Sequence, residues 1–337
     1  MNANALRPAW LALALLLGSL LLMLLGAGVG STGWESVWSL AAPDADPLAW
    51  QIVRDIRLPR TLGAWLAGAL LGLAGAVAQG VFRNPLADPY LLGSASGASL
   101  GVALAMAALG VSPFALQGLL RLGITGAAFA GAVGAVLLTL LLARGAHNTL
   151  RLLLAGVVVG VVLGAASSMV LMLSPEIMQA MQSFMLGSTA FVGWGACALM
   201  AAVLALVLLV AWSLSRVLDG LALGEATALS LGLPLAPLRM LLIVVMALAT
   251  GTAVAQTGLI AFVGLAAPHL VRSLVRAMHG WLLLLSAGMG AVLLLGADLL
   301  ARWLIAPQEL PVGVLTAVLG GSYLLWLMHR RNVQEIA

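Results

Sequence analysis

The chain has 337 residues, of which 63% are hydrophobic and only 8% charged, and its mean hydropathy is +1.15. A soluble globular domain carries about 25% charged residues, so this composition excludes a soluble protein and indicates one that spans a membrane. The formal charge of +4 does not predict a nucleic-acid partner, because the arginines separate apolar runs as membrane loop residues do.

Ten apolar runs are long enough to cross a hydrocarbon core of about 30 Å as helices. They predict an all-α, polytopic membrane protein of about ten transmembrane helices, with a single transmembrane domain over residues 1–337. The division near Gly258 is the least sharply marked, because apolar sequence continues across it. The predicted spans are residues 9–29, 61–81, 91–110, 118–143, 150–173, 190–212, 238–257, 259–276, 281–303 and 311–328.

The first apolar run has features of a secretory signal peptide, since Arg7 precedes it and small residues follow it. Its apolar stretch is long for such a signal, so we expect a retained helix.

Charge in the loops predicts the orientation of the chain. If the N-terminus lies inside, the cytoplasmic segments hold ten arginines and four acids, and the outer segments hold five arginines and seven acids. This asymmetry agrees with the excess of cations in cytoplasmic loops, so ten spans with both ends cytoplasmic are expected. Three of the five outer arginines lie within seven residues of one outer segment, against the excess of arginine in the cytoplasmic segments. They are Arg54, Arg57 and Arg60.

Glycines recur at helical spacing in three of the predicted spans. Small faces of this kind let helix backbones approach closely in lipid, although they could also line a wide passage. The sets are Gly68 and Gly72; Gly93, Gly97 and Gly101; and Gly156, Gly160 and Gly164.

The residues that carry catalysis or nucleotide binding are scarce. All fifteen cationic residues are arginine, so no Walker A lysine and no Schiff-base lysine exists. Four scattered histidines and the single Cys197 form no metal-ligand motif and no internal disulfide. We therefore expect no enzyme activity, no metal site and no cofactor.

Ion coupling is weakly supported, because no acid lies in the middle of a span. Asp298 is near the outer end of its helix, and Asp219 and Glu225 are in a loop. Backbone carbonyls and hydroxyls still leave sodium coupling open; the hydroxyls are those of Ser94, Ser96, Thr250 and Thr252.

For active transport, the remaining option is energy from a separate ATPase chain. Such a partner needs a docking surface on this protein. The cytoplasmic loop of about residues 213–237 reads as short amphipathic helices that end near Pro234 and Pro237. It is either the coupling loop for an ATPase or a plain connection between spans.

Seven stretches match the motifs of one transporter family, in family order. They are RLPR (57–60), RNPLADPYLLGSASGASLG (83–101), RLLLAG (151–156), LGEATALSLGLPL (223–235), GLIAFVGLAAPHLVR (258–272), ADLLAR (297–302) and ELPVGVLTAVLG (309–320). Over nearly its whole length the chain resembles the FecCD family, the permease subunits of ABC importers for iron chelates and cobalamin.

The resemblance implies a type II ABC importer permease in the inner membrane of a bacterium. It implies a homodimer around a central pathway, two copies of an ATPase subunit on the cytoplasmic side, and a periplasmic binding protein outside. ATP would be hydrolysed by the partner chains, and lipid would surround the permease.

The resemblance also assigns roles to the outward arginines. Arg57, Arg60 and Arg302 would meet carboxylates of the binding protein, in pairs that we expect to be partly exposed. The alternative is that these arginines only anchor helix ends at lipid head groups. Arg54 has no such assignment and is expected at the surface.

The same comparison places a cytoplasmic gate at Asn84 and Leu86 and at Asn148, Thr149 and Leu150. The family often carries small hydroxyl residues in the second of these loops, and HNTL (147–150) departs from that pattern.

The coupling helices would carry Glu225, Ala228, Leu229 and Gly232. The translocation pathway would be lined by a helix of small residues and methionines, although core packing explains methionines equally well. Its expected residues are Gly164, Ser167, Ser168, Met169 and Met172.

The expected function is ATP-driven import of a large metal chelate, foremost an iron–siderophore complex or haem. Cobalamin import by the same machinery is an alternative. An ion-coupled secondary transporter and a passive structural subunit are alternatives of other classes, and the sequence does not identify the chelate.

Overall fold

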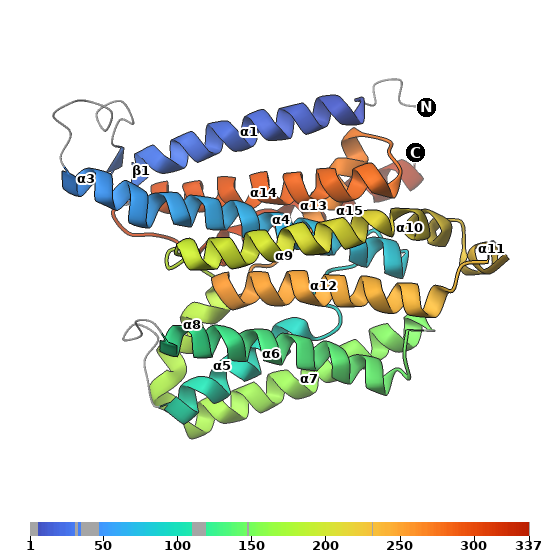
Figure 1. Ribbon diagram of the computed structural model, residues 1–337, viewed down its shortest axis with the longest axis horizontal. Helices are drawn as coiled ribbons and strands as arrows, with labels where there is room; N and C mark the ends of the chain where they lie inside the picture. The colour runs from blue at the N-terminus through green and yellow to red at the C-terminus, as the bar shows by residue number, and fades with distance from the viewer. Residues whose placement is uncertain are drawn as a thin grey trace.

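The chain folds as an all-α bundle (Figure 1), and the computed structural model describes residues 6–30, 33–34, 47–109, 119–146, 148–230 and 232–336. The long helices are α1 Pro8–Gly28, α4 Leu58–Phe82, α5 Ser94–Leu109, α6 Leu119–Leu142, α7 Thr149–Leu173, α9 Trp194–Ser213, α12 Leu235–Thr257, α14 His279–Trp303 and α15 Val312–Ile336. The shorter elements are α3 Pro47–Ile52, the π-helix η1 Val53–Arg57, the 3-10 helix η3 Pro175–Ile177, α8 Met178–Leu186, α10 Ser215–Ala222, α11 Glu225–Ser230 and α13 Val263–Leu274, with the paired two-residue strands β1 Val29–Gly30 and β2 Gly33–Trp34.

Each of the ten predicted spans contains a helix. Within the described ranges, seven helices are long and apolar enough to cross a membrane, and two shorter apolar helices are Ser94–Leu109 and Val312–Trp326. The predicted span 259–276 is shortened most, because α13 has only 12 residues. The chain is therefore a multi-pass membrane protein with full-length and shortened helices.

The shortening of α13 has a local cause at the boundary that the sequence marked least sharply. Gly258 ends α12 with φ +69°, and Phe262 immediately precedes α13 with φ +68°. A side chain at Gly258 would overlap the carbonyl oxygen of Phe184, so glycine is needed there for both conformation and space. The division near Gly258 is confirmed, and non-helical backbone occupies the next residues.

The centre of the bundle is α4, which is almost entirely buried and packs against α12, α13 and α14. Its glycines make this possible, because a Cβ at Gly68 or Gly72 would overlap the carbonyl oxygen of Gly290 or Ser286 on α14. Small residues are the usual means of close helix contact in lipid, so the predicted tight packing is confirmed here.

A second glycine contact joins α5 to α6. A Cβ at Gly97 would overlap the carbonyl oxygen of Gly131, and a Cβ at Gly131 would overlap that of Gly97. Gly160 and Gly164 on α7 are different, because a Cβ at either would meet nothing closer than the Ser96 hydroxyl, at 3.8 and 3.9 Å. The small face of α7 is therefore partly open.

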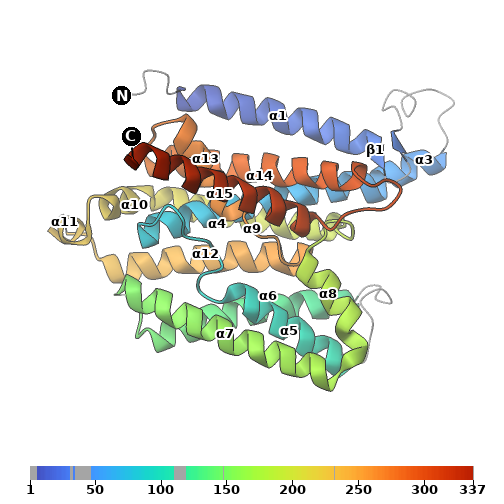
Figure 2. The ribbon, with the colours of Figure 1, turned by 180° about the vertical axis from the view of Figure 1, so that it is seen from behind.

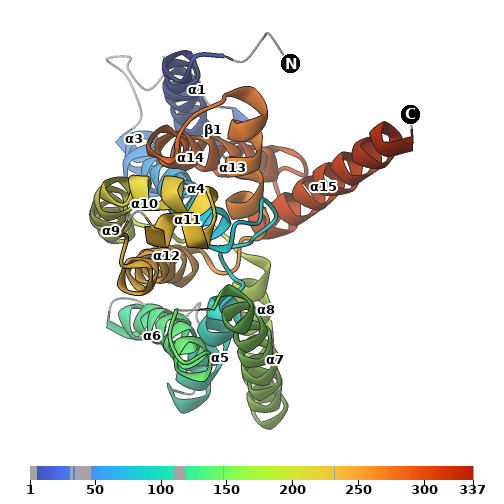
Figure 3. The ribbon, with the colours of Figure 1, turned by 90° about the vertical axis from the view of Figure 1, so that its right-hand side faces the viewer.

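The outer surface of the bundle is apolar. Leucines of α1, valines and methionines of α7 and leucines of α9 are exposed, whereas α4 is buried. Exposed apolar faces of this extent are expected where the solvent is lipid or where another chain covers them. Figure 3 shows that α15 extends away from the rest of the bundle.

The two ends of the bundle carry different short elements. Helices α10 and α11 lie at one end, and α3 and β1 lie at the opposite end (Figures 1 and 2). The distribution of arginines in the sequence assigns the α10–α11 end to the cytoplasm.

Candidate functional site

An ion cluster occupies the outer end of the bundle, between α4 and α14. Its centre is Asp298, whose side chain is fully buried. Arg60 donates to Asp298 Oδ1 from Nε at 3.3 Å and from Nη2 at 3.1 Å, and Arg302 donates to Oδ2. The Thr189 hydroxyl donates to Oδ1 from the connection between α8 and α9. One carboxylate therefore holds two arginines and joins three parts of the chain.

Glu309 completes this cluster at its rim, in the connection between α14 and α15. Nη1 of Arg60 lies 2.9 and 2.8 Å from the two carboxylate oxygens of Glu309, whose side chain is 26% exposed. Arg302 also donates to the Gly26 carbonyl, and Arg57 donates to the Gly28 carbonyl, both at 3.4 Å. The arginines thus tie the end of α1 to α4 and α14.

The structure places the expected docking arginines inside the protein. Arg57, Arg60 and Arg302 are 5%, 8% and 1% exposed, so the expectation of partly exposed pairs is wrong for this conformation. The reason is that the chain supplies its own carboxylates: Asp298 stands four residues before Arg302 on one helix face, and Glu309 follows in the next connection. Arg54 is exposed, as expected.

Short helices form the cytoplasmic loop, as the sequence predicted. Of the expected coupling residues, Ala228 is buried and Leu229 is exposed on α11. Glu225 begins α11, and Gly232 lies in the following turn with φ +77°. Asp219 on α10 accepts a hydrogen bond from the His279 backbone N–H at 3.0 Å and lies 2.7 Å from its Nδ1, which ties α10 to α14.

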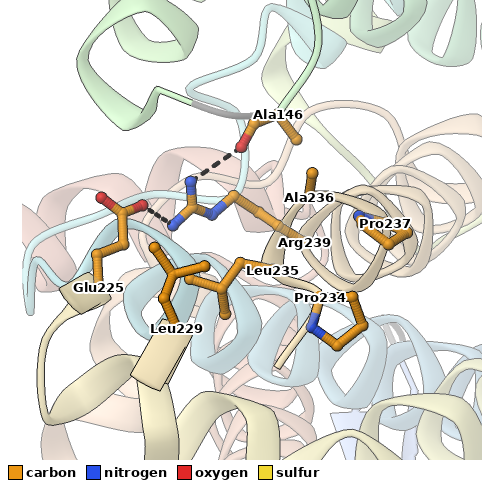
Figure 4. A pocket seen from close by; sticks show the side chains of 8 residues that line it. All are labelled: Ala146, Glu225, Leu229, Pro234, Leu235, Ala236, Pro237 and Arg239. Carbon is orange, nitrogen blue, oxygen red and sulfur yellow. Dashed lines mark hydrogen bonds and ion pairs between the residues drawn. The ribbon is translucent and has the colours of Figure 1, made fainter. Parts of the chain in front are cut away.

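Arg239 is a cytoplasmic residue to which the sequence assigned no role. Arg239, in the first turns of α12, donates to Glu225 of α11 and to the Ala146 carbonyl, the latter at 2.9 Å (Figure 4). A cavity of about 340 Å³ lies beside this contact. Arg239 stands alone in its sequence region, and only the fold reveals that it bridges two segments.

The residues expected at the gate lie in two places, the connection between α4 and α5 and the start of α7. Asn84 and Leu86 are exposed, and Asn84 Oδ1 accepts a hydrogen bond from the Leu86 N–H at 2.9 Å. In the same connection, burial raises the pKa of Asp88, whose Oδ1 accepts a hydrogen bond from the Tyr90 N–H at 2.8 Å.

The second segment expected at the gate is at the start of α7. Asn148 is exposed and caps the helix, because its Oδ1 accepts a hydrogen bond from the Arg151 N–H at 3.1 Å. Leu150 is exposed and Thr149 is half-buried. Within the described residues, no hydrogen bond joins this segment to Asn84 or Leu86.

Helix α7 presents most of the expected pathway residues on its open face. Ser168, Met169 and Met172 are exposed, and Gly164 is half-buried with its carbonyl accepting a hydrogen bond from the Ser168 hydroxyl at 3.1 Å. Ser167 differs, because it is buried and turned toward the protein. Across the part of the chain that the structure describes, no three His, Cys, Asp or Glu side chains come together as a metal site.

The comparisons with known proteins agree over nearly the full chain. The model of the FecCD transport family matches residues 13–330. The chain is 39% identical over 331 residues to the hemin transport system permease protein HmuU of Yersinia pestis, covering 95% of this chain and 97% of that protein. It is 38% identical over 310 residues to the vitamin B12 import system permease protein BtuC of Shigella boydii, covering 92% and 91%.

A solved structure has the same fold. It is described as an inward-facing conformation of a metal-chelate type ABC transporter, and it matches with a TM-score of 0.84 at 31% identity, covering 96% of this chain and 100% of that one. Matches of this extent in sequence and structure settle the family: the chain belongs to the FecCD transport family.

Proposed function

We propose that this protein is the membrane-spanning permease subunit of an ABC importer in the bacterial inner membrane. Its cargo is a large metal chelate, with an iron complex such as haem or an iron–siderophore foremost. The observation that carries this proposal is the near full-length match to a haem permease, a vitamin B12 permease and a metal-chelate transporter structure. Cobalamin import by the same machinery is the alternative that the second relative favours.

The energy source is a separate ATPase, present in two copies on the cytoplasmic side. The chain has no lysine and therefore no Walker A loop of its own. The exposed Leu229 and the partly exposed Glu225 of α11 offer a surface on which such a subunit acts.

The transport unit is a homodimer whose pathway runs beside α7. This proposal is supported by the open face of α7, where Met169 and Met172 are 64% and 82% exposed next to small residues. A passage of small and methionine side chains suits a bulky ligand that is to be moved rather than retained.

A periplasmic binding protein docks at the outer ion cluster. Because Arg60 already contacts Glu309 at the rim, docking would occur by exchange: a carboxylate of the binding protein replaces Glu309 on the guanidinium of Arg60. Arg57 and Arg302 donate to carbonyls at the end of α1, and the buried Asp298 keeps Arg60 oriented. Docking then leads to an ATP-driven change at α11 and to opening of the gate near Asn84 and Asn148.

Reconstitution into vesicles tests the proposed function. Uptake of haem or another iron chelate should require the permease, an ATPase subunit, the binding protein and ATP together. Uptake driven by a proton or sodium gradient without ATP would support the ion-coupled alternative, and no flux under either condition would favour a passive structural subunit.

A further inference from the structure

Arg239 connects three segments at the cytoplasmic end of the bundle. It belongs to α12 and is only 2% exposed. One guanidinium nitrogen, Nη2, donates to Glu225 at the start of α11, and the other, Nη1, donates at 2.9 Å to the carbonyl of Ala146 in the connection from α6 to α7 (Figure 4). Because the guanidinium is planar and rigid, it fixes the direction of both contacts at once.

The turn between α11 and α12 is held by two backbone hydrogen bonds, from the Gly232 N–H to the Leu229 carbonyl at 2.9 Å and from the Leu233 N–H to the Ala228 carbonyl at 3.3 Å. Among the described elements, α11 packs mainly on α10, and the cavity of about 340 Å³ separates its Glu225 and Leu229 from the turn at Pro234 and Pro237 that begins α12. The cavity leaves room for α11 to move relative to α12. The ion pair between Glu225 and Arg239 crosses the edge of that space.

The other contact of Arg239 lies next to the gate. Ala146 is buried, and two residues later Asn148 caps α7 by accepting a hydrogen bond from the Arg151 N–H. A displacement of the Ala146 carbonyl is therefore transmitted to the first turn of α7. That turn holds Thr149 and Leu150, which the family resemblance assigns to the gate.

We propose that Arg239 is a positioning residue that transmits movement of α11 to the cytoplasmic end of α7. This inference rests on the proposed function, in which a partner ATPase acts on α11. When α11 shifts, the ion pair with Glu225 displaces the guanidinium of Arg239. The hydrogen bond from the guanidinium to the Ala146 carbonyl then displaces the connection that precedes α7. Arg239 is buried within the permease, so it acts through the segment that precedes α7.

Two conservative substitutions test the link in the complete complex of permease, ATPase and binding protein in vesicles. Arg239→Lys keeps the charge but replaces the two-armed donor with a single ammonium group, and Glu225→Gln keeps the size but removes the charge. The ratio of chelate imported to ATP hydrolysed should fall about tenfold, the effect of losing a hydrogen bond to a charged group. ATP hydrolysis by the Arg239→Lys complex should stay within about twofold, because Arg239 is buried in the permease and lies outside the surface proposed for the ATPase. Arg276→Lys, an exposed arginine at the same end of the bundle, is the matched control.

A distance measurement separates transmission from a purely structural role. Spin labels at Leu223→Cys and Arg151→Cys, both exposed positions, report the spacing between the coupling loop and the start of α7, with Cys197→Ala removing the native thiol. The change in spacing on ATP binding should be lost in Arg239→Lys and retained in Arg276→Lys.

The outcomes are distinguishable. If the wild-type complex imports chelate with ATP but Arg239→Lys and Glu225→Gln keep both the wild-type ratio and the wild-type label movement, the inference is wrong and the proposed function stands. If the variants no longer assemble with the ATPase, Arg239 is a structural residue and the inference is also wrong. If the wild-type complex shows no ATP-driven uptake, the proposed function fails and the inference falls with it.

Discussion

Nη1 of Arg60 lies within 2.9 Å of both carboxylate oxygens of Glu309, so the rim of the outer ion cluster is closed by an acid of the same chain. Asp298 beneath it is fully buried and holds both Arg60 and Arg302. The two acids differ in exposure, and the difference predicts opposite consequences when each loses its charge.

Removal of the charge of Glu309 should strengthen docking of the binding protein. In Glu309→Gln, Arg60 no longer has its rim carboxylate, so a partner carboxylate binds without displacing one. A partly exposed pair contributes up to about 1 kcal/mol, so the Kd should fall by up to about fivefold. Binding of the cognate binding protein to the permease in nanodiscs measures this.

Glu176→Gln is the control for that measurement, since Glu176 is an exposed acid on η3. Equal affinities of the wild type, Glu309→Gln and Glu176→Gln for the binding protein would contradict the proposal that a partner carboxylate replaces Glu309 on Arg60.

Removal of the charge of Asp298 should destabilise the fold. Asp298→Asn leaves Arg302 and Arg60 buried without the central carboxylate, and breaking a buried ion pair from one side costs about 3–5 kcal/mol. Thermal unfolding of the purified protein in detergent should show a clearly lowered midpoint. Asp55→Asn, at an exposed acid of η1, should leave the midpoint unchanged, and a similar midpoint for both variants would contradict the central role of Asp298.

The contact between α5 and α6 predicts a difference between two glycines of one helix. In Gly131→Val the new side chain meets the backbone of Gly97, whereas a Cβ at Gly134 meets nothing within 4 Å. Overpacking costs about 1–3 kcal/mol, so Gly131→Val should unfold at a lower temperature than Gly134→Val. Equal midpoints would show that the two helices are not in close contact.

The proposed homodimer can be tested through the exposed face of α7. In a Cys197→Ala background, Met172→Cys should form a cross-linked dimer on mild oxidation of membranes. Leu17→Cys on α1, which is also exposed and apolar, should remain monomeric. A cross-linked dimer of Leu17→Cys, with none of Met172→Cys, would place the dimer interface away from α7.

The sequence predicted the helices well because a run of about 20 apolar residues has the length of a membrane-spanning helix. It predicted the break at Gly258, where a positive φ and the Phe184 carbonyl both require glycine. It overestimated the length of α13, because the apolar residues after Gly258 pack inside the protein without forming helix. Hydropathy does not distinguish an apolar segment that lies in lipid from one that packs inside the protein.

The sequence predicted local structure around the candidate site but not the contacts between distant segments. The helices of the coupling loop were predicted from its amphipathic pattern and are present. The burial of Arg60 and Arg302 was not predicted, although the four-residue spacing of Asp298 and Arg302 on one helix was a usable signal. The contact of Arg239 with Glu225 and Ala146 joins three segments, and no local pattern encodes it.

Chelate uptake into sealed vesicles tests the central claim most directly. Vesicles that contain the permease and its ATPase, with the binding protein and chelate on the opposite side from ATP, should accumulate chelate only while ATP is hydrolysed. Accumulation by the permease alone, in vesicles without any ATPase and under an ion gradient, would contradict the account.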